Sequence, residues 1–278
     1  MTSSKLTIIG SGNWPLKIQS VLNRSNSSQQ IEVISARNFL ENSKYLPNQF
    51  SLDSMFWIAT RPDIQLKILE KIKHVEKKII IEKPVVVNIS QLETLKSLLV
   101  ETKNTVFLSE PWKYSQIWAE TRSILKKNSQ PVKIQIERGG PGQRDYISQI
   151  WDWIPHDLGL VTDLIKELGS EVNLSVDSYT ENQQILLRID IPNRFTLKIC
   201  AGYFESRTAF WQTDTGLYID FINNTIMQDE KEIADFRNDQ PLVNMYNKII
   251  EAHDKPNVDI SLTELLLKAE LDSSKKLI

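Results

Sequence analysis

The stretch Ile80-Ile81-Glu82-Lys83-Pro84 places a lysine and a proline directly after an apolar run. Such a run predicts a buried strand, and a proline prevents the strand from continuing regularly. Lys83 is therefore expected at the carboxyl end of a strand, where open parallel sheets carry their binding sites. The alternative is an ordinary surface lysine, so the assignment depends on the rest of the chain.

Around this stretch, the first half of the chain alternates between short apolar runs and segments with helical spacing. The runs predict strands, and the helical spacing of apolar residues predicts amphipathic helices. This alternation is typical of a parallel sheet with right-handed crossovers. The predicted strands are residues 5–9, 31–35, 55–60, 78–81 and 105–109, and the predicted helices are residues 14–23, 63–73, 88–100 and 116–125.

The pattern changes after residue 130. Residues 132–138 alternate apolar and polar side chains, the segment 139–142 is expected to break this strand as a loop, and residues 147–168 are mostly helical. Repeated alternation further on predicts a half-buried, mostly antiparallel sheet. Its strands are residues 172–179, 184–191, 195–202, 208–213, 217–221 and 225–228, and helices at 242–253 and 261–271 close the chain. We expect two domains, residues 1–112 and residues 113–278.

A glycine turn, Gly10-Ser11-Gly12, follows the first strand and precedes the first helix. Glycine allows the backbone to approach a pyrophosphate closely, and the amino end of a helix favours its charge. Pro15 replaces the third small residue of the dinucleotide pattern, so a plain strand–helix turn is the alternative. The position of the turn in the first strand unit favours binding. The cofactor contacts assigned here are Gly10, Ser11, Gly12, Asn13 and Trp14.

The residues after the second strand usually contact the adenosine ribose, and an acidic residue there favours NAD. Here the strand ends in Ile34-Ser35-Ala36-Arg37, which has no acid at the expected place. Ser35 and Arg37 are candidates for binding a 2′-phosphate, which favours NADP. The alternative, equally open, is that Ser35 caps the next helix and Arg37 is solvated.

Asp152 and His156 lie four residues apart and therefore share one face of a helix. Together with Lys83, they are the groups needed to move a proton while a hydride moves elsewhere. The alternative is a buried structural histidine, because apolar and aromatic residues surround His156 in the sequence. The segment around Asp152 and His156 does not supply three metal ligands at a suitable spacing, so we expect no metal site.

Composition narrows the range of functions. A net charge of -2 gives no electrostatic reason to expect nucleic acid or an anionic membrane as a partner. The single cysteine, Cys200, excludes an internal disulfide and a cysteine-rich metal site, and a buried small hydrophobe is favoured over a nucleophile. No segment has the pattern of a signal peptide or the length of a membrane span, so we expect a cytoplasmic protein.

In their order along the chain, these motifs resemble those of the glucose–fructose oxidoreductase and inositol dehydrogenase family. The resemblance spans nearly the whole chain. Its most specific parts are the Glu-Lys-Pro after the fourth apolar strand and the Asp-x-x-x-His that opens a later helix. The ordered set is Gly10-Ser11-Gly12, Ile58-Ala59-Thr60, Glu82-Lys83-Pro84, the segment from Asp152 to Asp157, and Pro241-Leu242-Val243-Asn244-Met245.

The resemblance implies a Rossmann domain, which is a doubly wound parallel sheet, followed by an α+β domain with a large, mostly antiparallel open sheet. It implies hydride transfer between NADP, or NAD, and a sugar, nucleotide-linked sugar or cyclitol. In that family the lysine binds the reacting oxygen and relays its proton, the histidine is the general acid/base, and the aspartate orients substrate or histidine. These roles fall on Lys83, His156 and Asp152. The further cofactor contacts it implies are Ala59, Thr60, Glu82, Lys83 and Trp112.

Three departures from the family pattern favour a rival function. Pro15 replaces a small residue, Arg61-Pro62 stands where proline more often comes directly, and Gln65 lies near the expected place of a histidine. The rival is a non-catalytic protein of the same fold that senses a ligand or binds a partner while holding a dinucleotide. An imine reductase uses the same hydride chemistry and stays open as well.

The second predicted sheet also suggests self-association. Aromatic residues recur on its strands, at Phe210, Trp211, Tyr218 and Phe221. If they form an exposed apolar face, that face marks an interface. We therefore expect a homodimer or homotetramer that acts on a small molecule.

Overall fold

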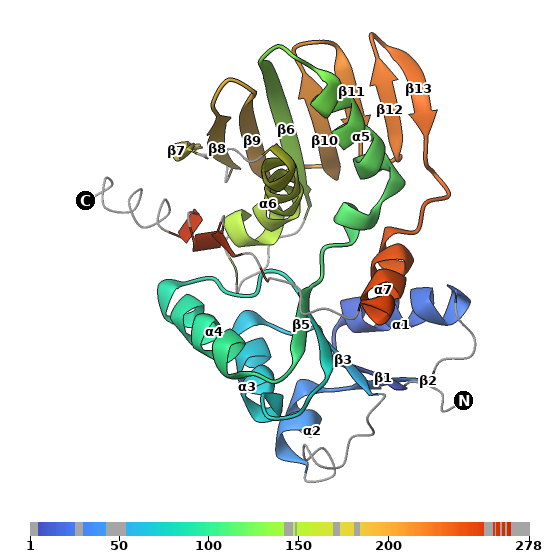
Figure 1. The fold of residues 1–278 in the computed structure, drawn as a ribbon, viewed down its shortest axis with the longest axis vertical. Coiled ribbons are helices and arrows are strands. Elements are labelled where there is room, and N and C mark those ends of the chain that lie inside the picture. The colour runs from blue at the N-terminus through green and yellow to red at the C-terminus, as the bar shows by residue number, and fades with distance from the viewer. Residues whose placement is uncertain are drawn as a thin grey trace. The chain divides into compact units, whose positions relative to one another are not determined.

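The computed structural model describes residues 5–25, 30–42, 54–141, 147, 149–168, 173–180, 184–252, 258, 260, 261, 263, 264, 266 and 267. The chain forms two compact units (Figure 1). The first comprises residues 1–110 and 242–259, and the second comprises residues 111–241 and 260–278. The domain boundary at residue 112 stays a prediction.

A parallel sheet forms the centre of the first unit. Among the described residues it has five strands in the order β2-β1-β3-β4-β5, so the chain continues on the other side of β1 after β2. The predicted parallel sheet is confirmed. Its strands are β1 (Lys5–Ile9), β2 (Gln30–Ile34), β3 (Met55–Ile58), β4 (Lys78–Ile81) and β5 (Thr105–Leu108), and the helices between them are α1 (Asn13–Ser25), α2 (Ala36–Glu41), α3 (Pro62–Ile72) and α4 (Ile89–Glu101).

One face of this sheet packs against α1 and against α7 (Pro241–Glu251), a helix from far along the chain. The rings of Trp57 in β3 and Tyr246 in α7 stack with centroids 6.1 Å apart. Lys78 Nζ donates a hydrogen bond to the carbonyl of Ile249 and another to that of Ile250, where the dipole of α7 favours a cation. Side chains from α7 therefore complete the hydrophobic core of the first unit.

The other face of the same sheet is equally buried. Phe56, Ile79 and Ile81 alternate with the residues that face α1 and α7, and none of them is more than 1% exposed. A parallel sheet needs helices on both faces, because its strands are apolar on both sides. Helices α3 and α4 contact one another and each buries an apolar stripe, formed by Leu66, Ile68, Leu69 and Ile72 in α3 and by Leu92, Leu95 and Leu98 in α4.

The second unit contains a mixed, mostly antiparallel sheet, as predicted. Among the described residues it has eight strands in the order β13-β12-β11-β10-β6-β9-β8-β7, and only the β6–β9 pair is parallel. The strands are β6 (Val132–Gly140), β7 (Asn173–Thr180), β8 (Gln184–Ile191), β9 (Phe195–Tyr203), β10 (Thr208–Thr213), β11 (Leu217–Asp220), β12 (Thr225–Gln228) and β13 (Lys231–Asp235). The helices of this unit are η3 (Pro111–Tyr114), α5 (Gln116–Lys127) and α6 (Gln149–Leu168).

The expected loop at 139–142 is wrong in its first half, because Gly139 and Gly140 continue β6. Gly139 pairs with Gly202 of β9, and a Cβ at Gly139 would lie 2.1 Å from the Gly202 carbonyl oxygen. These glycines therefore permit a close approach of two strands and do not end one. Residues 142–146 lie outside the described residues.

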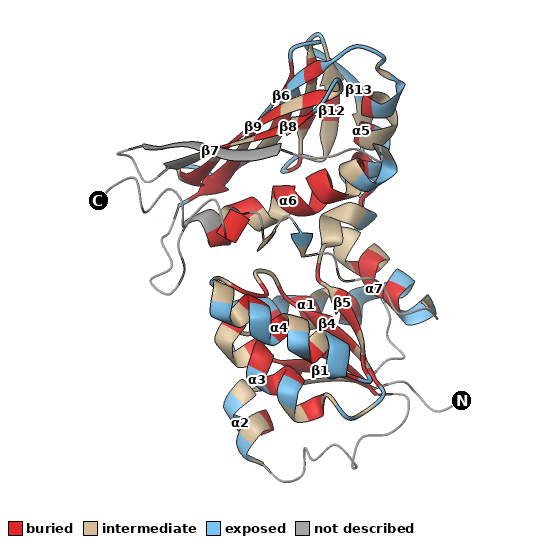
Figure 2. Cartoon of the chain, turned by 60° about the vertical axis from the view of Figure 1, so that its left-hand side comes forward, coloured by how far each residue is buried: buried red, intermediate tan, exposed pale blue. Residues whose placement is uncertain are grey.

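The aromatic residues of β10 and β11 do not share one face, which corrects the expectation from the sequence. Trp211 and Phe221 are at most 1% exposed, on the face that packs against the helices. Phe210 and Tyr218 lie half-buried on the opposite, outer face, where their rings stack 5.2 Å apart. Figure 2 shows the buried residues along α6 and the strands beside it. The oligomeric state stays a prediction.

Two short elements, η3 and β13, were not expected from the sequence, and α2 is the helix that Ser35 caps in the alternative interpretation. Of the predicted helix 261–271, residues 261, 263, 264, 266 and 267 are helical, and the rest lies outside the described residues. Among the described helices, none combines the length and the apolarity that a membrane crossing needs.

Candidate active site

The glycine turn lies at the carboxyl end of β1, next to the end of β3. The Ala59 N–H donates to the Ile9 carbonyl at 2.8 Å, which ties the end of β3 to β1. A Cβ at Gly10 would lie 2.3 Å from the Ala59 carbonyl oxygen and 2.7 Å from Pro15 Cγ. Gly10 is therefore required by packing alone, because any side chain there would collide with β3 and with α1.

Gly12 and Pro15 differ in surroundings. No atom lies within 4 Å of the place where a Cβ on Gly12 would be, so the backbone there borders open space. Pro15 is buried as the third residue of α1. Proline is tolerated in a first helical turn because that N–H has no partner within the helix. The same substitution removes one N–H from the amino end of the helix, where an anion would bind.

Ser35 and Arg37 make the contacts expected if Ser35 caps the next helix and Arg37 is solvated. The Asn38 N–H donates to Ser35 Oγ at 3.1 Å, so Ser35 caps α2. Arg37 pairs with Glu41 at 3.1 Å, and the Arg37 side chain is 83% exposed. An exposed pair of this kind contributes little to stability, so the guanidinium is free to exchange partners. A capping hydroxyl also keeps its own O–H to donate.

The segment Glu82–Pro84, here called the lysine loop, follows β4 directly. Glu82 is 7% exposed, and its Oε1 accepts a 2.8 Å hydrogen bond from the indole N–H of Trp57. Burial raises the pKa of the Glu82 carboxyl, while hydrogen bonds that include those of Trp14 and Trp57 oppose the rise. Glu82 thus links the lysine loop to Trp14, the second residue after the glycine turn.

Lys83 itself is half-buried at the carboxyl end of β4, where the sequence predicts it. Gln65, in the first turn of α3, is 1% exposed and binds the backbone of the lysine loop by three hydrogen bonds. From the sequence, Gln65 is only a departure from a family pattern. Its position in an apolar stripe of α3, where a buried amide needs partners, is the one signal that points to it.

Asp152 and His156 lie one turn apart on α6, in the second unit, and both are half-buried. Pro155 lies inside the same helix and cannot donate to the carbonyl four residues earlier. The spacing that predicts a shared helix face is therefore present. The roles of the two residues stay predictions.

Asp157, the next residue, is fully buried and fixes α6 to the sheet. Its carboxylate accepts hydrogen bonds from Arg138 Nε at 2.5 Å and Nη2 at 2.9 Å, and from Trp211 Nε1 at 2.9 Å. Arg138 belongs to β6 and Trp211 to β10. A buried ion pair with this many hydrogen bonds sets the rotation of α6, and with it the direction of His156. Its partners could not be assigned from the sequence.

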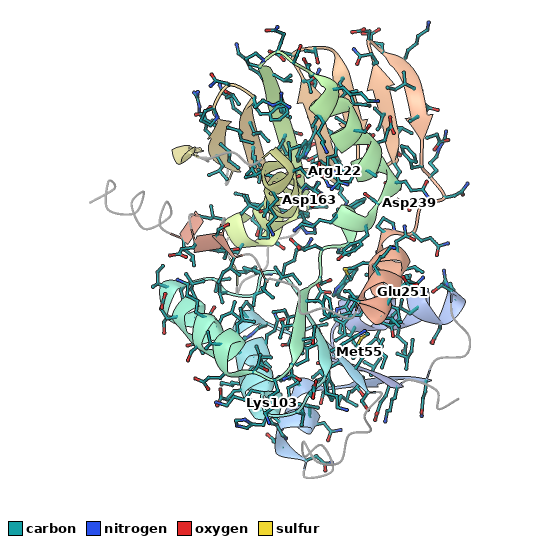
Figure 3. The ribbon with its side chains drawn as sticks, viewed as in Figure 1. Met55, Lys103, Arg122, Asp163, Asp239 and Glu251 are labelled. Atoms are coloured by element: carbon teal, nitrogen blue, oxygen red, sulfur yellow. The ribbon has the colours of Figure 1, made fainter. Side chains whose placement is uncertain are left out.

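A second set of polar contacts joins α6 to α5. Asp163 Oδ2 accepts from Arg122 and from the indole of Trp118, each at 2.7 Å (Figure 3). Trp112, predicted as a cofactor contact, lies in η3 of this second unit and packs edge-on against Phe221 with ring centroids 5.7 Å apart. Its contact with a cofactor stays a prediction.

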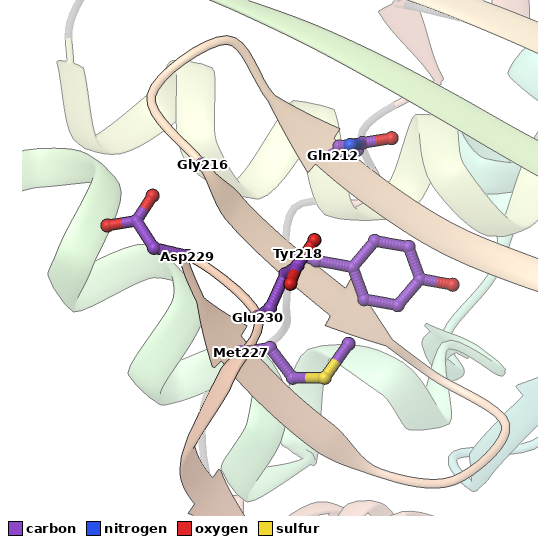
Figure 4. A pocket seen from close by; sticks show the side chains of 6 residues that line it. All are labelled: Gln212, Gly216, Tyr218, Met227, Asp229 and Glu230. Carbon is purple, nitrogen blue, oxygen red and sulfur yellow. The ribbon is translucent and has the colours of Figure 1, made fainter.

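A hollow of about 490 Å³ lies elsewhere, on the outer face of β10 to β12 (Figure 4). Tyr218 and Met227 border it in the close-up, and acidic residues of the β12–β13 turn lie at its edge. Its lining residues are Gln212, Gly216, Tyr218, Met227, Asp229 and Glu230, none of which is a predicted site residue.

Solved structures with this fold are dehydrogenases. The UDP-N-acetylglucosamine 3-dehydrogenase of Acidithiobacillus ferrooxidans has a TM-score of 0.67 at 15% identity, covering 91% of this chain and 89% of its own. The myo-inositol 2-dehydrogenase of Lactobacillus plantarum has a TM-score of 0.66 at 10% identity, covering 93% and 92%. The aldose-aldose oxidoreductase of Caulobacter crescentus, solved with glycerol, has a TM-score of 0.70 at 11% identity, covering 98% of each chain.

These neighbours confirm, at the level of the fold, the resemblance inferred from the motifs. Identities of this size establish a shared architecture and leave substrate and activity open. Comparison of the sequence with protein-family models and with curated proteins finds no match.

Proposed function

We propose that this chain is a nicotinamide-dependent oxidoreductase acting on a hydroxyl or carbonyl group of a sugar, nucleotide-linked sugar or cyclitol. The observation that carries the proposal is the arrangement at one edge of the first sheet. Gly10, Ala59 and Lys83 follow the carboxyl ends of the adjacent strands β1, β3 and β4. The strand order reverses between β1 and β3, and open α/β sheets bind ligands at such a point.

The residues of the first unit fit a dinucleotide. Gly12 leaves open space beside the start of α1, where a side chain would obstruct a pyrophosphate. The N–H groups of Asn13 and Trp14 lie in the first turn of that helix and have no partner within it. Ser35 and Arg37 would bind the 2′-phosphate of NADP after Arg37 leaves Glu41. The other predicted contacts are Ser11, Ala59, Thr60, Glu82, Lys83 and Trp112.

The chemistry divides between cofactor and protein. A bound nicotinamide supplies the hydride acceptor or donor. In the direction of oxidation, His156 takes the proton of the substrate hydroxyl, and the ammonium group of Lys83 stabilises the negative charge that develops on that oxygen. Asp152 orients His156 or a substrate hydroxyl from one turn earlier on the same helix.

The choice of substrate class follows from the named neighbours together with the residues. By their names, those proteins act on UDP-N-acetylglucosamine, myo-inositol and aldoses, all of which carry several hydroxyl groups. A lysine and an imidazole suit a secondary alcohol and its ketone. A panel of sugars, nucleotide sugars and inositols is therefore the substrate screen to use.

Two measurements test the proposal. In the first, tryptophan fluorescence is followed while NADPH or NADH is added, because Trp14 lies two residues after the glycine turn and is 39% exposed. We expect binding, with NADPH the tighter of the two. Binding of neither would make the rival, a partner-binding protein of the same fold, the leading function, since Pro15 removes one N–H from the site.

The second measurement is turnover by the variant Lys83→Met. We expect it to keep most of its affinity for NADPH and to lose about 100-fold or more in turnover, the usual contribution of a group that handles the transferred proton. The matched control is Lys67→Met, which removes an exposed lysine from α3. Equal turnover by Lys83→Met and the control would refute the assigned role.

A further inference from the structure

We propose that Gln65 is the positioning residue for Lys83. Its carboxamide holds the backbone on both sides of the lysine, so that the lysine side chain starts from a fixed point at the end of β4. The inference deepens the proposed function and rests on it for the catalytic meaning of Lys83. The contacts that support it stand independently of any substrate.

The carboxamide uses its donor and its acceptor on the same three-residue loop. Gln65 Nε2 donates to the carbonyl of Glu82 at 2.9 Å and to that of Pro84 at 3.2 Å, one on each side of Lys83. Gln65 Oε1 accepts from the Glu82 N–H at 2.9 Å. Glutamine carries a donor and an acceptor on one planar group, which an aliphatic side chain, a carboxylate, a lysine or an arginine does not.

The loop needs these bonds because the strand ladder ends before it. The last residue of β4 is Ile81, whose carbonyl accepts from the Ser109 N–H at 2.8 Å. The Glu82 N–H is shared between Gln65 and the Ile58 carbonyl at 3.0 Å, which is the final tie to β3. Beyond it, Gln65 supplies the bonds to the Glu82 and Pro84 carbonyls that a regular strand would have provided.

The position of Gln65 follows from the way α3 begins. Pro62 occupies the first turn, and the Gln65 N–H makes an early helical hydrogen bond, 2.9 Å long, to the Arg61 carbonyl. The helix therefore starts four residues after the last residue of β3, which places its fourth residue beside the end of the neighbouring strand β4. At 1% exposure, no water can replace the amide without a rearrangement of the core.

A lysine that stabilises charge on a reacting oxygen must be held closely, because a displacement of about 1 Å costs roughly 100-fold in rate. Loss of the Gln65 bonds frees the backbone on both sides of Lys83 while the cofactor contacts of the glycine turn stay in place. The expected signature is a fall in kcat with unchanged affinity for NADPH. A purely structural role would lower stability and leave both quantities unchanged in the folded protein.

The experiment compares the full-length wild type with Gln65→Met, which has a similar length and makes no such hydrogen bonds. Lysines are labelled by reductive methylation with 13C-formaldehyde, and the Lys83 resonance is identified by its absence in Lys83→Arg. In Gln65→Met we expect this resonance to shift or broaden, while those of Lys73 and Lys78 in the same unit keep their positions. We also expect kcat to fall by about 10- to 100-fold.

The matched control is Gln91→Met. Gln91 Oε1 accepts a 2.9 Å hydrogen bond from the Val87 N–H, so it is also a half-buried glutamine bound to backbone a few residues beyond the lysine loop. The variant Gln91→Met should leave the Lys83 resonance unchanged. If Gln65→Met does not fold, Gln65→Asn serves instead, because it keeps the neutral carboxamide and shortens its reach to the lysine loop by one methylene group.

The outcomes separate the two proposals. An unchanged Lys83 resonance in a folded Gln65 variant overturns the positioning role, whatever the enzyme does. A shifted resonance with kcat equal to that of the wild type also overturns it, since the loop would then have no influence on catalysis. A wild type that binds NADPH and turns over no sugar refutes the proposed function, whereas a shifted resonance would still establish the Gln65 contacts.

Discussion

The indole N–H of Trp57 and the carboxylate of Glu82 form a 2.8 Å hydrogen bond in the interior of the first unit. Trp57 is completely buried in β3, so a residue of the sheet core determines where the carboxylate next to Lys83 lies. The same carboxylate also bonds to Trp14, beyond the glycine turn. Any change in the charge of Glu82 is therefore felt by both candidate binding segments of this unit.

The first prediction concerns the pH dependence of stability at Glu82. Burial raises its pKa in the folded protein above the ordinary 4.5, so the folded state keeps a proton that the unfolded chain has lost. The stability this supplies is complete below pH 4.5 and is lost as pH rises through the folded pKa. Glu82→Gln cannot ionise, so its stability relative to the wild type should increase as pH rises from 4.5 through the folded pKa of Glu82, and should stay constant above that pKa.

Urea unfolding at a series of pH values measures this difference. Glu101→Gln is a control of opposite sign, because the hydrogen bond from Lys73 lowers the pKa of the exposed Glu101 carboxyl. Relative to the wild type, that variant should lose stability as pH rises through the folded pKa of Glu101. A stability difference for Glu82→Gln that stays flat with pH would contradict the assignment.

A second prediction concerns the ion pair that fixes α6. Asp157→Asn keeps the shape of the side chain and leaves the buried Arg138 charge without its counter-ion, which should cost about 3–5 kcal/mol. Asp190→Asn is the matched control, because Asp190 forms the same kind of paired contact with Arg188 at an exposed site and should change stability by about 1 kcal/mol or less. Denaturant midpoints of the two variants distinguish these values, and equal losses would show that burial of the Asp157 pair is unimportant.

A third prediction separates cofactor preference from stability after β2. Arg37→Ala should weaken NADPH binding by about tenfold, the value of one lost ionic contact, and leave NADH binding unchanged. Its stability should stay within about 0.5 kcal/mol of the wild type, because the Arg37–Glu41 pair is exposed. Ser35→Ala should instead destabilise by about 1 kcal/mol through the lost helix cap. Equal effects of Arg37→Ala on both nucleotides would remove Arg37 from the 2′-phosphate site.

A fourth prediction concerns the turn between β12 and β13. Asp229 and Glu230 both have positive φ, at 49° and 66°, a conformation that favours glycine in the second position of a two-residue hairpin turn. Glu230→Gly should therefore stabilise the protein by about 1 kcal/mol. Thermal unfolding measures the change. Glu232→Gly, in the strand that follows, should destabilise, and stabilisation by both variants would exclude the backbone explanation.

Much of the fold follows from local pattern. The isoleucines of β4 and the apolar run of β1 are buried on both faces, and such runs have few structures open to them other than a parallel strand. Lys83 follows one of these runs, so its place at a strand end was predictable. Asp152 and His156 were predictable as a pair because four residues make one helical turn.

The predictions that the structure corrects concern features that tertiary contacts determine. Phe210 and Trp211 are consecutive in one strand and so must point to opposite faces, and the packing of the sheet decides which of the two faces inward. Gly139 suggested a loop, but the nearby backbone of β9 requires a glycine in a strand. Gln65 could not be assigned, because its partners lie 17 and 19 residues away in another loop.

Helix α7 lies far along the chain from the sheet that it covers, and this has a consequence for synthesis on the ribosome. Val243, Met245, Tyr246 and Ile249 belong to the same core as Leu6 and Trp57, although more than 180 residues separate Trp57 from the first of them. Domains generally fold as they emerge, starting from the amino end. This amino-terminal unit instead has to wait, with part of its apolar sheet uncovered, until α7 has been translated. During that interval we expect the uncovered apolar face of the sheet to bind a chaperone.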